Sequence, residues 1–182
     1  FAGGIVVHTT AGIAALILAW LIKPRRGFNK SLLPPHSPAL TMTGAGLLWV
    51  GWFGFNGGSA LAAGDSASAA IMNTHLAACA AAISWLVIER IKIGKPTSIG
   101  IVTGAIAGLA TVTPAAGYIG PMGAIILGAT AGAICVYAVG LKERFGYDDS
   151  LDVVGVHLVG GVIGTILIGF LASESMPNGV NG

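Results

Sequence analysis

Long apolar runs, separated by short polar or Pro- and Gly-rich breaks, dominate the chain. A helix of about 20 apolar residues is long enough to cross the ~30 Å hydrocarbon core of a bilayer. The pattern predicts six helices, at residues 1–22, 39–60, 68–91, 98–112, 121–141 and 151–172. The fourth run is short for a span, so we expect that protein shields it or that the membrane is thin there.

Composition places the chain among polytopic membrane proteins. Of its 182 residues, 54% are hydrophobic and only 9% are charged, whereas a soluble domain has about 25% charged residues. We therefore predict an all-α, polytopic integral membrane protein. The formal net charge of +2 is too small to suggest a nucleic-acid partner, and the two cysteines lack the spacing of metal ligands, so we expect neither metal nor cofactor. Because the chain opens at Phe1, already inside an apolar run, we expect an internal piece of a longer protein.

The basic residues predict the orientation in the membrane. All nine follow the first, third or fifth predicted helix: Lys23, Arg25, Arg26, Lys30, Arg90, Lys92, Lys95, Lys142 and Arg144. By the positive-inside rule these three loops are cytoplasmic, and the first helix enters the membrane from outside. The first and sixth helices then run in opposite directions, as in transporters whose halves are related by an axis in the membrane plane.

Those two helices each carry one histidine, His8 and His157, within the apolar run. An ionisable side chain in lipid is costly and normally faces the protein interior or a pathway. Glycines lie one turn away from each histidine, and Gly160 with Gly164 forms a GxxxG pair that lets another backbone come close. A lone buried histidine is more often a packing residue, but two in matching contexts suggest a paired site. The inverted arrangement predicts that they meet near mid-bilayer.

The second predicted helix contains the densest motif, WVGWFGFNGGS at residues 49–59. One interpretation is an interfacial aromatic belt, which suits Trp49. The other is a pore mouth, because desolvated aromatic faces attract cations and a serine hydroxyl accepts a hydrogen bond from an N–H donor. Such a mouth would suit a small cation such as ammonium.

With these motifs the chain resembles the ammonium transporters of the Amt/Mep/Rh superfamily, and the Trp-rich motif favours the Amt side over Rh-type proteins. The matching segments are 1–8 (FAGGIVVH), 51–59 (GWFGFNGGS), 73–74 (NT), 94–100 (GKPTSIG), 105–121 (AIAGLATVTPAAGYIGP) and 152–157 (DVVGVH). The family has eleven spans, and this piece looks like the fifth to the tenth. The resemblance implies an ammonium-transporter fold with inverted pseudo-two-fold halves, present in part. Within a single transmembrane piece, 1–182, residues 1–22 would close the first half and 39–172 would form the second.

The resemblance also implies a conduction path lined by seven residues, namely His8, Leu48, Trp52, Phe55, Ser59, Val153 and His157. The two histidines match the twin histidines of a narrow apolar pore. Trp52 and Phe55 match aromatic positions on the path, with Phe55 in a stacked gate pair, and Ser59 matches the hydroxyl of an outer recruitment site. Leu48 and Val153 match apolar pore-lining positions. The gate partner of Phe55 lies outside this chain.

Charged residues gather just before the sixth predicted helix. A carboxylate is favoured at a helix N-terminus, so we expect Asp152 to support the site structurally by capping this helix and fixing the approach to His157. The other charged residues of the segment are expected to form a solvated face: Lys142, Glu143, Arg144, Asp148 and Asp149.

The physical chemistry of such a pore agrees with ammonium or ammonia transport. Bare ammonium in an apolar pore would face a severe desolvation penalty, whereas neutral ammonia would not. The resemblance further implies a homotrimer in the cell membrane, with basic loops that contact a trimeric nitrogen-signalling regulator. Two alternatives stay open. One is an Amt-like ammonium sensor. The other is a membrane enzyme that uses the histidines, disfavoured because a stable metal site needs three or four ligands.

Overall fold

The computed structural model describes residues 1–31 and 34–177. Its helical elements, in chain order, are η1 (Gly4–Thr9), α1 (Thr10–Ile22), α2 (Pro38–Gly58), α3 (Asp65–Ile93), α4 (Ser98–Val112), α5 (Pro121–Ala138), α6 (Leu141–Phe145), η2 (Val154–Leu158) and α7 (Val159–Leu171). The two η elements are π-helical turns that run directly into α1 and α7. The described residues contain no strand, and their one isolated β-bridge pairs Ile119 with Ala172. The prediction of an all-α fold is confirmed.

Four helical segments in the described part of the chain are long and apolar enough to cross a membrane. They are Gly4–Ile22, Asp65–Ile93, Pro121–Phe145 and Val154–Leu171. Helix α4 is apolar but has only 15 residues, in agreement with the short fourth run predicted from the sequence. The four segments agree with a polytopic membrane protein.

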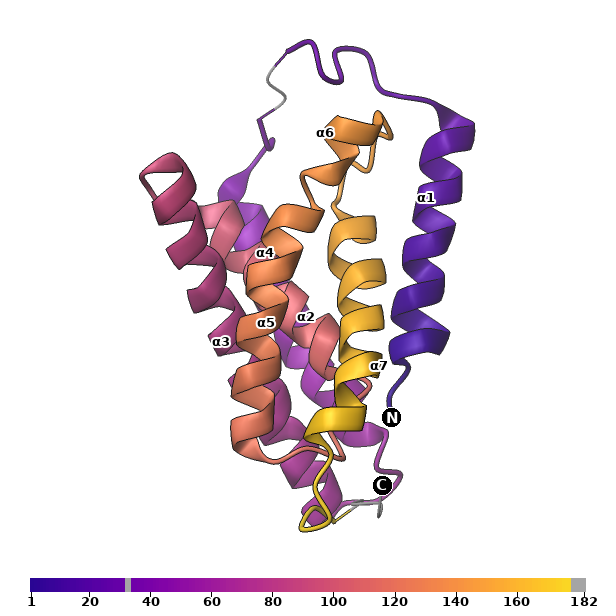
Figure 1. Ribbon diagram of the computed structural model, residues 1–182, viewed down its shortest axis with the longest axis vertical. Coiled ribbons are helices and arrows are strands. Elements are labelled where there is room, and N and C mark those ends of the chain that lie inside the picture. The colour runs from indigo at the N-terminus through magenta and orange to yellow at the C-terminus, as the bar shows by residue number, and fades with distance from the viewer. Residues whose placement is uncertain (32–33, 178–182) are drawn as a thin grey trace.

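The helices of the two histidines run antiparallel on one side of the bundle. In Figure 1, α1 rises from the N-terminus while α7 descends beside it. Segment η1 contacts α7, and α1 contacts η2, so the two helices cross near their histidines. The end of α1, the end of α3 and helix α6 all lie at the upper end of Figure 1. The basic segments of the sequence therefore share one end of the molecule, as the positive-inside rule predicted.

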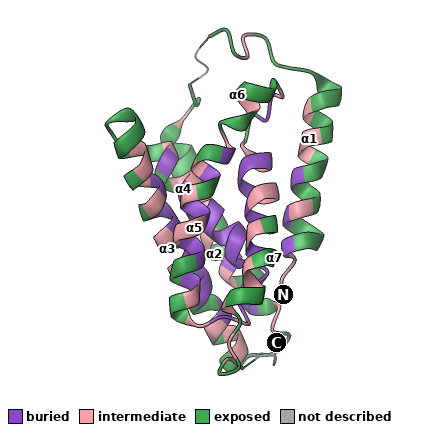
Figure 2. Cartoon of the chain, in the orientation of Figure 1, coloured by how far each residue is buried: buried purple, intermediate pink, exposed green. Residues whose placement is uncertain are grey.

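Small residues allow α3, α4 and α5 to pack closely at the centre of the bundle. Figure 2 shows buried positions concentrated on these helices and on α7, while α1 is mostly exposed. A Cβ atom added at Gly108 of α4 would lie 2.5 Å from the backbone oxygen of Ala77, and one added at Gly128 of α5 would overlap the same oxygen. In a membrane, where lipid is as apolar as the helix surfaces, such backbone-to-backbone packing drives helix association.

The break between α4 and α5, residues 113–120, is non-helical and mostly buried. Its backbone is satisfied by protein: Asn73 Nδ2 donates to the backbone oxygens of Ala116 (2.9 Å) and Ile119 (2.6 Å). Irregular backbone at membrane depth is tolerated where protein buries it in this way. Within the break, the Pro114 ring packs against both Gly4 and Gly164, so it touches both histidine helices.

We expect Gly128→Ala to destabilise the bundle by about 1–3 kcal/mol, because the added methyl group would overlap the Ala77 backbone and overpack a tight contact. Gly169→Ala on α7 is the matched control, since a Cβ at that position meets nothing within 4 Å. Thermal unfolding of the full-length protein in detergent measures both. Equal melting temperatures for the two variants would contradict close packing at Gly128.

Candidate functional site

The structure brings His8 and His157 together. Their Nδ1 atoms lie 3.1 Å apart, and their ring centroids lie 5.2 Å apart. A contact of this length between two imidazole nitrogens requires that one carries the proton and the other offers its lone pair. His8 is buried, with 3% of its surface exposed, and its Nε2 has no hydrogen-bond partner among the described residues.

Each histidine lies on a π-helical turn. In η1, the backbone N–H of His8 donates to Gly3 O, five residues back, at 3.1 Å. The hydroxyl of Thr9 also donates within this turn, to Gly4 O at 3.0 Å. His157 lies within η2. Single π turns inside α-helices are frequent at functional sites.

Glycines make the crossing of the two helices possible. A Cβ added at Gly12 would collide with Leu158, the residue after His157. One added at Gly161 would lie 2.7 Å from Gly4 O and 3.0 Å from His8 Cβ. The crossing therefore depends on glycine at both positions.

Trp52 stacks against the pair from α2. Its ring lies 5.2 Å from His8 at an interplanar angle of 18°, and 6.3 Å from His157 at 15°. Phe55 meets the rings of His8 and Trp52 edge-on, each at 6.0 Å. The structure thus gathers two histidines and two aromatic rings, all four singled out by the sequence.

Thr113 holds Trp52 in place and was missed by the sequence analysis. The indole Nε1 donates to Thr113 Oγ1 at 2.8 Å, and that hydroxyl donates to Leu109 O at 2.7 Å. Thr113 follows the last residue of α4 and is fully buried. A hydroxyl in a mostly apolar run, directly before Pro114, was the available signal.

Two cavities flank the histidines, and Leu48 lines both. The first, about 390 Å³, lies on the side of the C-terminal end of α2 and is lined by His8, Leu48, Gly51, Trp52 and Phe55. The second, about 220 Å³, opens toward the basic end and is lined by Thr41, Ala45, Leu48, Val102, Thr103, Ile106, Leu151, Val156 and His157. Each histidine therefore faces its own cavity, with the hydrogen-bonded pair between them.

Ser59 and Val153 lie outside the two cavities at the histidines. Ser59 caps the C-terminus of α2, and its hydroxyl donates to Phe55 O at 2.9 Å. Val153 lines a separate hollow of about 280 Å³ beside α1, together with Arg25 and Asp148.

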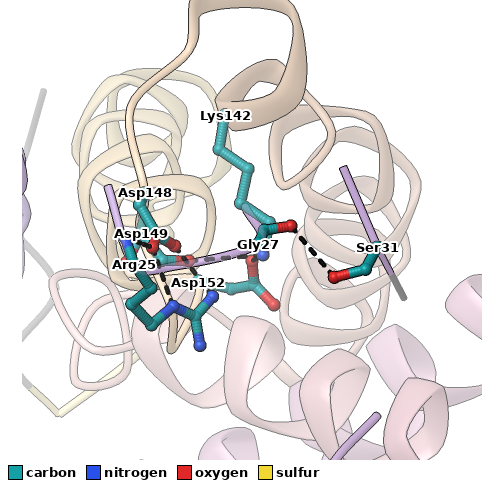
Figure 3. A network of polar contacts seen from close by, with 7 residues as sticks. All are labelled: Arg25, Gly27, Ser31, Lys142, Asp148, Asp149 and Asp152. Atoms are coloured by element: carbon teal, nitrogen blue, oxygen red, sulfur yellow. Dashed lines mark hydrogen bonds and ion pairs between the residues drawn. The ribbon is translucent and has the colours of Figure 1, made fainter. Parts of the chain in front are cut away.

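The acidic segment before η2 differs from the expected solvated face, because Asp148 and Asp149 are buried. Figure 3 shows their polar contacts. Asp148 binds Arg25, and hydrogen bonds from Arg25 hold the pKa of the Asp148 carboxyl below its usual range. Asp149 accepts hydrogen bonds from the backbone N–H groups of Val153 (3.0 Å) and Val154 (2.6 Å). The expected cap of the helix is therefore supplied by Asp149 and not by Asp152.

Asp152 instead forms an ion pair with Lys142 at 2.5 Å. Burial raises the pKa of the Asp152 carboxyl, and Lys142 opposes this shift. Its backbone lies in the left-handed region, with φ at 58°, where a non-glycine residue is uncommon. Asp152 thus marks the turn that leads into the His157 helix.

Comparison with known sequences gives a consistent result. A sequence model described as Ammonium Transporter Family matches residues 1–182. An ammonium transporter of Mycobacterium tuberculosis (strain H37Rv) is 50% identical over the whole chain, and the match covers 39% of that protein. The ammonium transporter Amt1 of Archaeoglobus fulgidus is also 50% identical over the whole chain, covering 46% of that protein.

Solved structures agree. Mep2 of Saccharomyces cerevisiae superimposes with a TM-score of 0.90 at 40% identity, covering 97% of this chain and 40% of Mep2. A structure titled Sensor Amt Protein gives a TM-score of 0.92 at 32% identity, covering 96% of this chain and 45% of that one. The chain therefore spans less than half the length of these relatives.

We expect Thr113→Val to destabilise the protein by about 1–3 kcal/mol, because it leaves the buried indole N–H of Trp52 without its acceptor. Thr130→Val is a matched control: the Thr130 hydroxyl also donates to a carbonyl four residues back, Ile126 O, but on an exposed face. Denaturant unfolding in detergent compares the two. An equal loss from both variants would show that the Trp52 hydrogen bond contributes nothing to stability.

Proposed function

The chain belongs to the ammonium transporter family, and from this premise we propose that the full-length protein moves ammonium or ammonia across the cell membrane along a path at the His8–His157 pair. The chain is part of a multi-pass membrane protein, and its relatives are named transporters, not enzymes. The observation that carries the proposal is the pair of imidazoles, His8 buried and His157 half-buried, hydrogen-bonded at 3.1 Å with a cavity on each side.

The surroundings of the pair support a path for a small nitrogen species. The first cavity, on the side of the C-terminal end of α2, is called the outer cavity below. It is lined by the aromatic rings of Trp52 and Phe55, which attract a cation as it loses water. We propose that Ser59, at the outer end of α2, helps to recruit ammonium there by accepting a hydrogen bond. Apart from His8, the lining of this cavity is apolar, so a bare cation would be penalised there and neutral ammonia would not.

The histidine pair can then hold or relay a proton, since each imidazole has one nitrogen that donates and one that accepts. The His8 ring lines the outer cavity, and its Nε2 is buried without a hydrogen-bond partner among the described residues. Potassium has no proton to give and no N–H to donate. Selectivity against potassium follows from this chemistry. We also propose Leu48 as a lining residue between the two cavities, and Val153 as a lining residue of the path on the cytoplasmic side.

An ammonium sensor is the second candidate function. The structural match to a protein titled Sensor Amt Protein, at a TM-score of 0.92, favours it. A sensor would use the same ring cluster to bind ammonium but would not need to pass it on. Flux measurements therefore separate the two functions.

The assembly and its partners are carried over as proposals. We propose a homotrimer embedded in the lipid bilayer, with a trimeric nitrogen-signalling regulator at the cytoplasmic face. The support is the gathering of the basic segments at one end of the molecule (Figure 1). The division of the chain into the last helix of one half, 1–22, and a second half, 39–172, stays a prediction.

The test uses the full-length protein in proteoliposomes, with an ammonium pulse, a potassium pulse, and records of current and internal pH. We expect a response to ammonium and none to potassium. His157→Ala, which removes half of the hydrogen-bonded pair, should abolish the response or relax its selectivity toward potassium.

His75→Ala is the control, because His75 packs against Trp49 and Phe53 away from the pair. It should leave selectivity unchanged. A wild-type protein that binds ammonium but gives neither current nor pH change would favour the sensor.

A further inference from the structure

An ion pair joins the segment after the His8 helix to the segment before the His157 helix (Figure 3). Arg25 lies three residues beyond the end of α1. Its Nε and Nη2 donate to Oδ2 and Oδ1 of Asp148 at 2.7 and 2.8 Å, and its backbone N–H donates to Oδ2 at 2.8 Å. A guanidinium that grips both carboxylate oxygens fixes orientation as well as distance. The Asp148 side chain is 2% exposed, so the carboxylate of this ion pair is shielded from solvent.

Asp149, the residue after Asp148, connects the ion pair to the helix of His157. Both carboxylate oxygens of Asp149 accept hydrogen bonds from the first turn, from the N–H groups of Val153 and Val154. Val154 is the first residue of η2, which contains His157. Because consecutive Cα atoms are held about 3.8 Å apart, the Asp148–Asp149 dipeptide connects Arg25 to the start of that helix.

These contacts and the helix crossing oppose different motions. The crossing at Gly12 and Leu158 lies beside His157, so tilting about it moves the His157 ring little. Sliding along the helix axis, or rotation about it, would move the ring directly. The Nδ1–Nδ1 distance of 3.1 Å leaves little room for such motion, because a hydrogen bond is lost beyond about 3.5 Å.

We propose that Arg25 and Asp148 are positioning residues for the histidine pair: their ion pair fixes the axial position and the rotation of the His157 helix against the His8 helix. Neither residue contacts the histidines, so both act through Asp149 and η2. The inference rests on the proposed function, because the position of the pair affects transport only if the path runs through it.

A purely structural ion pair would behave differently. The Arg25 side chain is 50% exposed, and the backbone N–H of Arg25 still donates to Asp148 Oδ2 when the guanidinium is removed, so the loss of stability is limited although the Asp148 side chain is only 2% exposed. Removing the pair should therefore leave the protein folded while the rings shift. This separates a positioning role from a contribution to the fold.

The experiment compares Arg25→Gln with Arg26→Gln in the full-length protein. Arg26 is the exposed neighbour of Arg25, has the same charge, and makes no ion pair within the described ranges. The first measurement is nitrogen-15 solid-state NMR of histidine-labelled protein in bilayers, with the His8 and His157 signals identified through His8→Ala and His157→Ala. The second is ammonium flux in proteoliposomes.

We expect Arg25→Gln to shift the Nδ1 signals of both histidines and to lower the flux by about 10- to 100-fold, the scale produced by a displacement of about 1 Å at reacting groups. Arg26→Gln should change neither measurement, and both variants should melt within a few degrees of the wild type. If Arg25→Gln fails to fold, Arg25→Lys replaces it. Lysine keeps the charge but loses the two-pronged contact, so it should give a shift of the same signals with a smaller loss of flux.

If a folded Arg25 variant keeps the Nδ1 signals of the wild type, the positioning role is overturned, even if its ammonium flux is lower. Shifted signals with wild-type flux would overturn it as well, because the pair would have moved without effect on transport. A wild type without flux contradicts the proposed function instead, and the NMR comparison then still decides whether Arg25 positions the rings.

Discussion

Backbone contact between two helices is the constraint on which the histidine pair depends. Lipid is as apolar as the helix surfaces, so burial alone does not bring helices together in a membrane. Gly12 lies against Leu158, and Gly161 lies against Gly4 and His8. A larger side chain at either glycine would separate the helices and, with them, the two imidazoles. The hydrogen bond between the rings and the close crossing are therefore one structural feature.

Much of this arrangement could be predicted from the sequence, because the relevant signals are local. Apolar runs indicate helices, and the paired motifs around His8 and His157 indicate an inverted contact once the basic loops set the orientation. The GxxxG pair does receive a close neighbour, Thr111 near the end of α4: Gly164 meets its backbone oxygen and Gly160 its hydroxyl. The motif alone did not predict which helix would pack against it.

The features that escaped prediction depend on geometry or on distant partners. Helical periodicity assumes 3.6 residues per turn, whereas the wide turns η1 and η2 shift the face on which later residues lie. Val153, which the resemblance places among the pore-lining residues, lines the hollow beside α1, and its place on the path stays a prediction. Asp148 was expected in solvent because its partner, Arg25, lies 123 residues away in the sequence. Its neighbour Asp149 supplies the helix cap that was expected from Asp152. The backbone turns sharply at Asp152, just before the helix begins.

Pro114 contacts both histidine helices at once, at Gly4 and at Gly164. The two helices therefore contact each other at Gly12 and Leu158, and both contact the buried break between α4 and α5 through Pro114. A rocking motion of either helix would have to displace that break. Alternating access requires one half of a transporter to move against the other about the substrate site. These contacts oppose such a rocking motion near the rings. Passage between these histidines would then follow a stationary route, in which protons and small molecules move while the protein frame stays still.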